Sequence, residues 1–114
     1  AEPGKSRSRP DEKRKAVRLL TLARDLRRRK ARERDGRFVA EGVRAVEELL
    51  ASGLEVAGAL VAPSLGTTSR GAALRAALDA AGIAVAAVGE GEFASAAETD
   101  APQGVLAIGV APSD

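Results

Sequence analysis

Apolar residues recur along the chain in two alternating patterns, continuous short runs and stretches at helical spacing. The continuous runs are rich in Val and Ala and end at Gly or Pro, which is typical of buried strands; they lie at residues 37–42, 56–62, 83–88 and 104–110. The stretches between them repeat apolar residues three or four positions apart, and so predict amphipathic helices; these cover residues 43–52, 72–81 and 90–97. Strands and helices are therefore expected in alternation.

The four predicted strands are too continuously apolar for a sheet with one solvated face, so helices must cover both faces. We therefore expect an α/β fold, a three-layer α/β/α sandwich with a four-stranded sheet, preceded by a basic N-terminal helix. Between the second strand and the next helix, residues 64–71 predict a polar loop in which Thr68 or Ser69 is available as an N-cap.

The region before the first strand has its own organisation. Residues 1–10 are rich in Pro, Gly and Ser and predict a disordered lead-in. Asp11 is a suitable N-cap, and Asp35-Gly36 is a suitable helix stop, so we expect a basic amphipathic helix over residues 11–35 and an α/β domain over residues 36–111. The apolar positions that would dock the first half of this helix are Ala16, Leu19, Leu20, Ala23 and Leu26. Its second half has nothing to bury.

The formal net charge of +2 hides a division of the chain into two parts. Up to Arg37 there are fifteen Lys or Arg and six Asp or Glu, whereas from Phe38 onward there are three and ten. Between residues 24 and 37 there are seven Arg and one Lys, and Arg forms bidentate contacts with phosphate. This asymmetry favours a polyanionic partner, the other interpretation being a solvated face that aids solubility.

The missing residue types restrict the chemistry. The chain contains no Cys and no His, so it offers no thiolate, no Ser-His-Asp triad and no Cys- or His-based zinc site. We therefore predict no catalytic residue and no metal site. Only Phe38 and Phe93 are aromatic, which favours contact with the phosphates and shape of a structured nucleic acid over stacking on its bases.

Two glycine-rich segments resemble nucleotide-binding loops only superficially. Gly89-Glu90-Gly91 lacks the third glycine of a dinucleotide fingerprint, and residues 66–71 lack the Gly-Lys-Ser/Thr ending of a P-loop, so both are interpreted as turns. No apolar run approaches the roughly 20 residues that span a bilayer, and the N-terminus is polar. We expect a cytoplasmic protein with no membrane partner.

Two motifs give the chain a family resemblance. Residues 34–44 read R-x-G-x-F-x-x-E-G-x-R, and residues 99–105 read T-x-x-P-Q-G-V. Both motifs, and the elements between them, resemble the N-terminal substrate-binding domain of SpoU/TrmH-type RNA 2′-O-ribose methyltransferases, of the SPOUT superfamily, over roughly residues 19–110.

The resemblance implies the fold of kink-turn-binding ribosomal proteins and a domain that grips structured RNA, ribosomal RNA in the first place and transfer RNA in the second. It also implies a knotted catalytic domain after residue 114 that binds S-adenosylmethionine and forms a homodimer. We expect this chain alone to be monomeric, to bind no cofactor and to methylate nothing. We expect Glu41 to anchor the turn that follows it.

The residues predicted to contact RNA are basic and come mainly from the Arg-rich segment; they are Arg24, Arg27, Arg28, Arg29, Lys30, Arg32, Arg34, Arg37, Arg44 and Arg70. Two other functions remain open on the sequence. One is a free-standing ribosomal or kink-turn-binding protein, and the other is a protein-interaction module whose basic helix docks an acidic partner.

Overall fold

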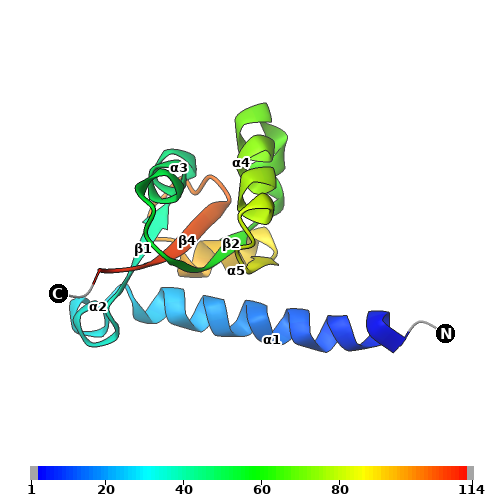
Figure 1. The fold of residues 1–114 in the computed structure, drawn as a ribbon, viewed down its shortest axis with the longest axis horizontal. Coiled ribbons are helices and arrows are strands. Elements are labelled where there is room, and N and C mark those ends of the chain that lie inside the picture. Colours follow the sequence, from blue (N-terminus) through cyan, green and yellow to red (C-terminus); the bar gives the residue numbers. More distant parts are fainter. Residues whose placement is uncertain (1–2, 113–114) are drawn as a thin grey trace.

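A computed structural model describes residues 3–112, with side chains over residues 12–112, as a four-stranded sheet between helices (Figure 1). The strands are β1 (Arg37–Glu41), β2 (Val56–Val61), β3 (Val85–Ala87) and β4 (Val105–Val110). The helices are α1 (Pro3–Asp25), α2 (Arg29–Asp35), α3 (Val43–Ser52), α4 (Ser69–Ala80) and α5 (Glu90–Ala96), with a short 3₁₀ helix, η1 (Pro63–Thr67). From β1 onward, the predicted alternation of strands and helices is confirmed.

The last strand in the sequence lies inside the sheet. The strand order is β1-β4-β2-β3, in which β4 runs antiparallel to both of its neighbours and β2 and β3 are parallel. Residues 105–109 of β4 are all buried, which explains why this strand is apolar without interruption.

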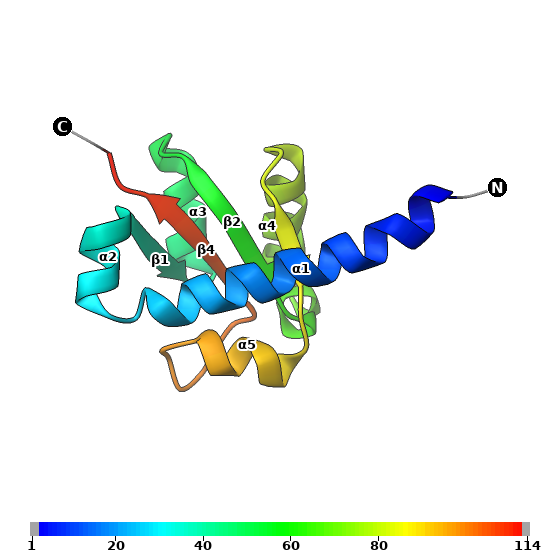
Figure 2. The ribbon, with the colours of Figure 1, turned by 90° about the horizontal axis from the view of Figure 1, so that it is seen from below.

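Each face of the sheet packs against its own pair of helices. Along β4, Leu106 and Ile108 join the cluster that contains α1 and α5, whereas Val105 and Ala107 join the cluster that contains α3 and α4. Figure 2 shows α1 crossing the first of these faces, beside α5. The three-layer α/β/α sandwich is confirmed, and α1 is itself part of one layer.

The N-terminal boundaries differ from the expected ones. The first helix begins at Pro3, where a disordered lead-in over residues 1–10 and an N-cap at Asp11 were expected; residues 1–2 lie outside the described part. Proline suits the first turn of a helix because its missing N–H needs no partner there. A helix docked at one end also extends readily, since each further residue adds one hydrogen bond.

The single helix expected over residues 11–35 is divided into α1 and α2. Arg28 is extended (φ −91°, ψ 133°) and ends the turn between them. Leu26 and Ala31 are only 1% and 2% exposed and lie in the same core cluster. In a continuous helix these two side chains would point about 140° apart, so the break is what returns Ala31 to the core.

The end of α2 is the helix stop that the sequence predicted. Gly36 is the C-cap, in the left-handed conformation (φ 65°, ψ 33°), and its N–H donates to the carbonyl of Arg32. The carbonyl of Gly36 then accepts from the N–H of Ala111 at 2.8 Å, just after β4. The chain therefore leaves β4 close to α2.

Candidate nucleic-acid interface

The ten predicted residues do not form one surface. Eight of them lie on α1, the α1–α2 turn, α2 and the first residue of β1. Arg44 lies on α3 and Arg70 on α4, which cover the opposite face of the sheet from α1 (Figure 1). The structure therefore separates the Arg-rich segment from Arg44 and Arg70.

The side chain of Arg32 caps the C-terminal end of α1. Its guanidinium Nη1 donates to the carbonyl of Leu26 at 2.9 Å and to the carbonyl of Arg27 at 3.0 Å. These carbonyls follow the last turn of α1, where backbone acceptors lack helical partners and a cation also interacts favourably with the helix dipole. Arg32 is half-buried and supports the turn between α1 and α2.

Arg34 and Arg37 bind groups of the two acidic residues beside them, Asp25 and Asp35. Arg34 Nη2 lies 2.8 Å from Asp25 Oδ2, and its Nε lies 2.9 Å from Asp35 Oδ1. The hydrogen bond from Arg34 lowers the pKa of Asp35, and the same hydrogen bond raises the pKa of Arg34. Arg37 Nη1 donates to the carbonyl of Asp35 at 2.9 Å. These two arginines therefore hold α2 against α1 and β1.

Arg24 and Arg27 reach across to α5. Arg24 Nε donates to Ser95 Oγ at 3.2 Å, and Arg27 Nη1 approaches the carbonyl of Ser95 at 3.5 Å. Both acceptors are uncharged, so the contacts orient the guanidinium groups without neutralising them. The positive charge of both residues remains available to a ligand.

Three of the exposed predicted residues on the α1–α2 turn and α2 have a weak partner or none. The side chains of Arg28 and Lys30 make no hydrogen bond or ion pair within the described part of the chain. Arg29 pairs with Glu33 at 3.3 Å, but the two side chains are 82% and 65% exposed. A pair this exposed contributes only a few tenths of a kcal/mol, roughly, and yields readily to a competing anion.

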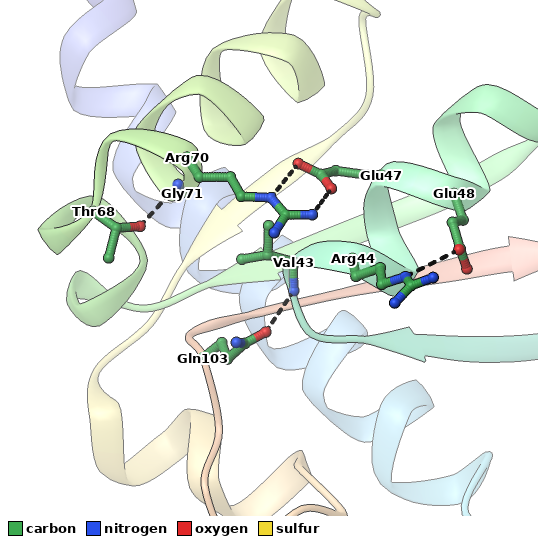
Figure 3. A network of polar contacts seen from close by, with 8 residues as sticks. All are labelled: Val43, Arg44, Glu47, Glu48, Thr68, Arg70, Gly71 and Gln103. Atoms are coloured by element: carbon green, nitrogen blue, oxygen red, sulfur yellow. Dashed lines mark hydrogen bonds and ion pairs between the residues drawn. The ribbon is translucent and has the colours of Figure 1, made fainter.

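Arg44 and Arg70 are engaged within their own layer, as Figure 3 shows. Arg70 donates to both carboxylate oxygens of Glu47, at 3.1 and 2.6 Å, and thereby joins α4 to α3. The hydrogen bond from Arg70 lowers the pKa of Glu47. Arg44 lies 3.4 Å from Glu48 on the same helix, with 84% of its side chain exposed.

The segment expected to be a polar loop, residues 64–71, is mostly helical. It contributes to η1 and to the first turn of α4. The N-cap prediction is confirmed at Thr68, whose Oγ1 accepts from the N–H of Gly71 at 3.0 Å (Figure 3). The cap fixes the start of α4 and hence the position of Arg70.

The two sequence motifs meet at the start of α3. Gln103 Oε1 accepts from the N–H of Val43 at 2.8 Å and so caps a helix that begins sixty residues earlier (Figure 3). Gly42 has φ +96°, and a Cβ there would lie 2.9 Å from Gln103 Oε1. Glu41 Oε1 accepts from the N–H of Glu98 at 2.9 Å, so Glu41 anchors the segment after α5 and not, as expected, the turn that follows it. The two motifs thus meet where the entry to β4 contacts the start of α3.

Arg18 is a basic residue of this region that the sequence reasoning did not select. It lies on α1, is exposed, and its side chain has no ion pair or hydrogen bond among the described residues. It was passed over because it belongs to the half of the helix that docks. The signal was its spacing of seven residues before Asp25, which places both on the outward face of α1.

The glycine-rich segment before α5 forms a helix cap. Gly89 N–H donates to Glu92 Oε1 at 3.2 Å, and the carboxylate of Glu90 accepts from the N–H and hydroxyl of Ser64 at 2.6 and 3.0 Å. The loop is therefore filled by its own acidic side chains. Residues 12–112 contain no cluster of three or more potential metal ligands of the His, Cys, Asp or Glu type. Within the described residues, no helix combines the length and apolar character needed to cross a membrane.

Comparison with known protein families gives one match. A family model described as the MRM3-like substrate-binding domain matches residues 20–107, which is most of the chain. A comparison with curated proteins found no match.

Solved structures with the same fold include several methyltransferases. One, an RNA 2′-O ribose methyltransferase, is 29% identical, has a TM-score of 0.71 and is matched over 83% of this chain and 35% of its own. An rRNA methyltransferase from Sinorhizobium meliloti is 24% identical, has a TM-score of 0.63 and is matched over 84% of this chain and 34% of its own. The SpoU methyltransferase AviRb from Streptomyces viridochromogenes is 21% identical, has a TM-score of 0.62 and is matched over 84% and 34%. The chain spans about a third of the length of these enzymes.

Proposed function

The chain belongs to the family of MRM3-like substrate-binding domains, and on that premise we propose that it is the RNA-recognition domain of an S-adenosylmethionine-dependent RNA ribose 2′-O-methyltransferase. The likeness to an RNA 2′-O ribose methyltransferase at 29% identity supports the reaction class. In this proposal the chain binds the RNA substrate, and the rest of the parent enzyme catalyses the methyl transfer.

The observation that carries the proposal is the uncompensated charge along α1, the α1–α2 turn and α2. Arg28 and Lys30 have no partner in the described part of the chain, Arg29 has an exposed and weak one, and Arg24 and Arg27 bind only neutral groups of Ser95. Such a concentration of free cations attracts a polyanion. We place the RNA-contacting surface here, and we leave out Arg44 and Arg70 because they lie in the opposite layer.

The substrate we propose is structured RNA, held through its phosphates. The described part of this surface contains no aromatic side chain on which an unpaired base would stack, and the chain's two Phe lie elsewhere, Phe93 being buried under α1. Guanidinium groups suit phosphate oxygens by charge and by geometry. Ribosomal RNA is the first target to test and transfer RNA the second, as expected of SpoU/TrmH-type enzymes.

No residue of this chain is assigned to S-adenosylmethionine. Of the two glycine-rich segments, the one at Gly89 is filled by the side chains of Glu90 and Glu92, which accept hydrogen bonds from the N–H groups of Ser64 and Gly89. We propose that the cofactor and the homodimer interface belong to a further domain of the parent enzyme, and that the isolated chain is a monomer.

The test is direct binding of the chain to a structured ribosomal RNA fragment by fluorescence anisotropy, over a series of salt concentrations. We expect binding that weakens steeply with salt, because each phosphate contact contributes a slope of about 0.7 to 0.9. We expect the variant Arg28→Glu/Lys30→Glu to bind at least about tenfold more weakly, because it places two anions against the phosphates.

Polyglutamate at the same salt concentrations is the competing ligand. If the chain bound polyglutamate tightly and RNA not at all, it would be a module for acidic proteins instead. Unchanged RNA binding in the charge-reversal variant would show that the RNA interface does not lie on α2.

A further inference from the structure

A shallow hollow lies on the outward face of α1, where α1 turns into α2. Its volume is about 650 Å³. The residues that line it come from the second half of α1 and from the turn; they are Arg18, Thr21, Leu22, Arg24, Asp25 and Arg28. Of these six side chains, one is acidic and three belong to arginines, two of them on α1 and one in the turn between α1 and α2.

The acidic side chain in the hollow is already neutralised. Asp25 lies 2.8 Å from Arg34, which approaches from α2 and is not itself part of the lining. Arg34 also pairs with Asp35, and Arg37 lies beside Asp35, so the two acids and the two arginines balance. The three arginines of the hollow therefore have no negative charge left to offset them locally.

The polar side chains that line the hollow are available to bind a ligand. Within the described residues, the side chains of Arg18 and Arg28 make no hydrogen bond or ion pair, and neither does the hydroxyl of Thr21. Arg24 is oriented by Ser95 Oγ, a neutral acceptor that leaves its charge intact. Leu22 contributes an apolar floor and packs on the core cluster beneath.

We infer that this hollow is a phosphate-binding site, at which Arg18, Arg24 and Arg28 hold the sugar–phosphate backbone of the RNA. The guanidinium groups supply charge and paired donors, and the Thr21 hydroxyl supplies another donor. The site contains no aromatic ring, so it orients the RNA without reading its bases. The inference rests on the proposed function and extends its interface along α1 to Arg18, outside the Arg-rich run.

Arg34 acts here as a positioning residue. It does not line the hollow, but it keeps the Asp25 carboxylate paired, and a free carboxylate at the edge of the hollow would repel phosphate. The arginines of α1 and the turn thus contact the ligand, whereas Arg34 of α2 prepares the surface for it.

The test compares two variants that lose the same charge. Arg18→Gln/Arg28→Gln removes two cations from the hollow, and Arg44→Gln/Arg75→Gln removes two from α3 and α4, where each pairs only with an exposed acid. Both variants are first checked for an unchanged urea unfolding midpoint. Binding to a structured ribosomal RNA fragment is then measured from about 0.05 to 0.3 M salt.

We expect the hollow variant to bind roughly 30-fold more weakly at about 0.1 M salt, and its salt slope to be smaller by about 1.5, which corresponds to two lost phosphate contacts. The α3–α4 variant should bind almost as the unchanged chain does. Equal losses in both variants would mean that binding follows net charge alone and would overturn the site.

The remaining outcomes separate the site from the proposed function. If the unchanged chain binds RNA and the hollow variant binds it equally well, the site is wrong and the proposed function stands. If the unchanged chain binds polyglutamate and no RNA, the proposed function fails and the site fails with it.

Discussion

Arg32 and Lys30 lie two positions apart on α2, but their surroundings give them different roles. Arg32 turns back to bind two carbonyls at the end of α1, whereas Lys30 extends into solvent with no partner in the described structure. A charge that already caps a helix is not free to hold a phosphate. The role of each basic residue therefore depends more on its local contacts than on its position in the Arg-rich segment.

Replacing Arg32 by Ala should destabilise the chain by about 1 kcal/mol, because the partly buried hydrogen bond to the carbonyl of Leu26 and the exposed one to the carbonyl of Arg27 are both lost. Lys30→Ala should leave the free energy of unfolding unchanged within about 0.5 kcal/mol, since an exposed side chain without contacts is removed. Urea denaturation of the two variants measures the difference. A loss of stability in Lys30→Ala as large as that in Arg32→Ala would contradict this division.

The sequence shows where positive charge is concentrated, but it does not show which arginines are already bound. Arg34 was predicted as an RNA contact, and its pairing with Asp25 depends on α2 folding back along α1. Arg18 was missed for a different reason, because it lies in the half of α1 that docks on the sheet, although its spacing from Asp25 places it on the outward face of that helix.

The start of α3 shows how the elements of this fold are joined. The helix begins at Gly42, whose backbone N–H donates to the carbonyl of Val105, and its first N–H, that of Val43, donates to Gln103. The entry to β4 therefore supplies the cap that α3 lacks in its own sequence. The T-x-x-P-Q-G-V motif holds the sheet and this helix together.

Replacing Gln103 by Leu should cost about 1 kcal/mol of stability, the usual effect of losing a helix cap, because Leu keeps much of the volume but accepts no hydrogen bond. Asp100→Ala is the matched control in the same loop, since the Asp100 side chain has no partner among the described residues. Thermal or urea unfolding compares the two. Equal stability of both variants would show that the cap contributes nothing.

Elements were predicted well where glycines mark their ends. The helix over residues 43–52 was predicted with its observed bounds, because Gly42 and Gly53 frame an amphipathic stretch. The break in the N-terminal helix was not predicted, because no Gly or Pro marks residues 26–28. It arises from tertiary packing, which buries both Leu26 and Ala31.

At the scale of the whole molecule, charge is divided between the N-terminal helices and the rest of the fold. The basic residues concentrate on α1 and α2, and most of the acids follow Phe38, on the remaining helices and loops. A polyanion is attracted to one side of such a molecule and repelled from the rest, so the fold orients its ligand before any specific contact forms.

The sequence predicted the layers of this molecule but not the order of its strands. Continuous apolar runs at residues 56–62 and 104–110 require burial on both faces, which implies helices on both sides. They do not specify that β4 inserts between β1 and β2, because that depends on pairing between residues some seventy positions apart, such as Phe38 with Gly109.

The central claim is that RNA is held on α1 and α2 and not on α3 and α4. An NMR titration of the ¹⁵N-labelled chain with a structured ribosomal RNA fragment, at about 0.1 M salt, tests it residue by residue. The account predicts the largest shifts at Arg18, Thr21, Arg28 and Lys30, with the signals of Arg44 and Arg70 unchanged. Shifts confined to Arg44, Arg70 and their neighbours on α3 and α4 would contradict it.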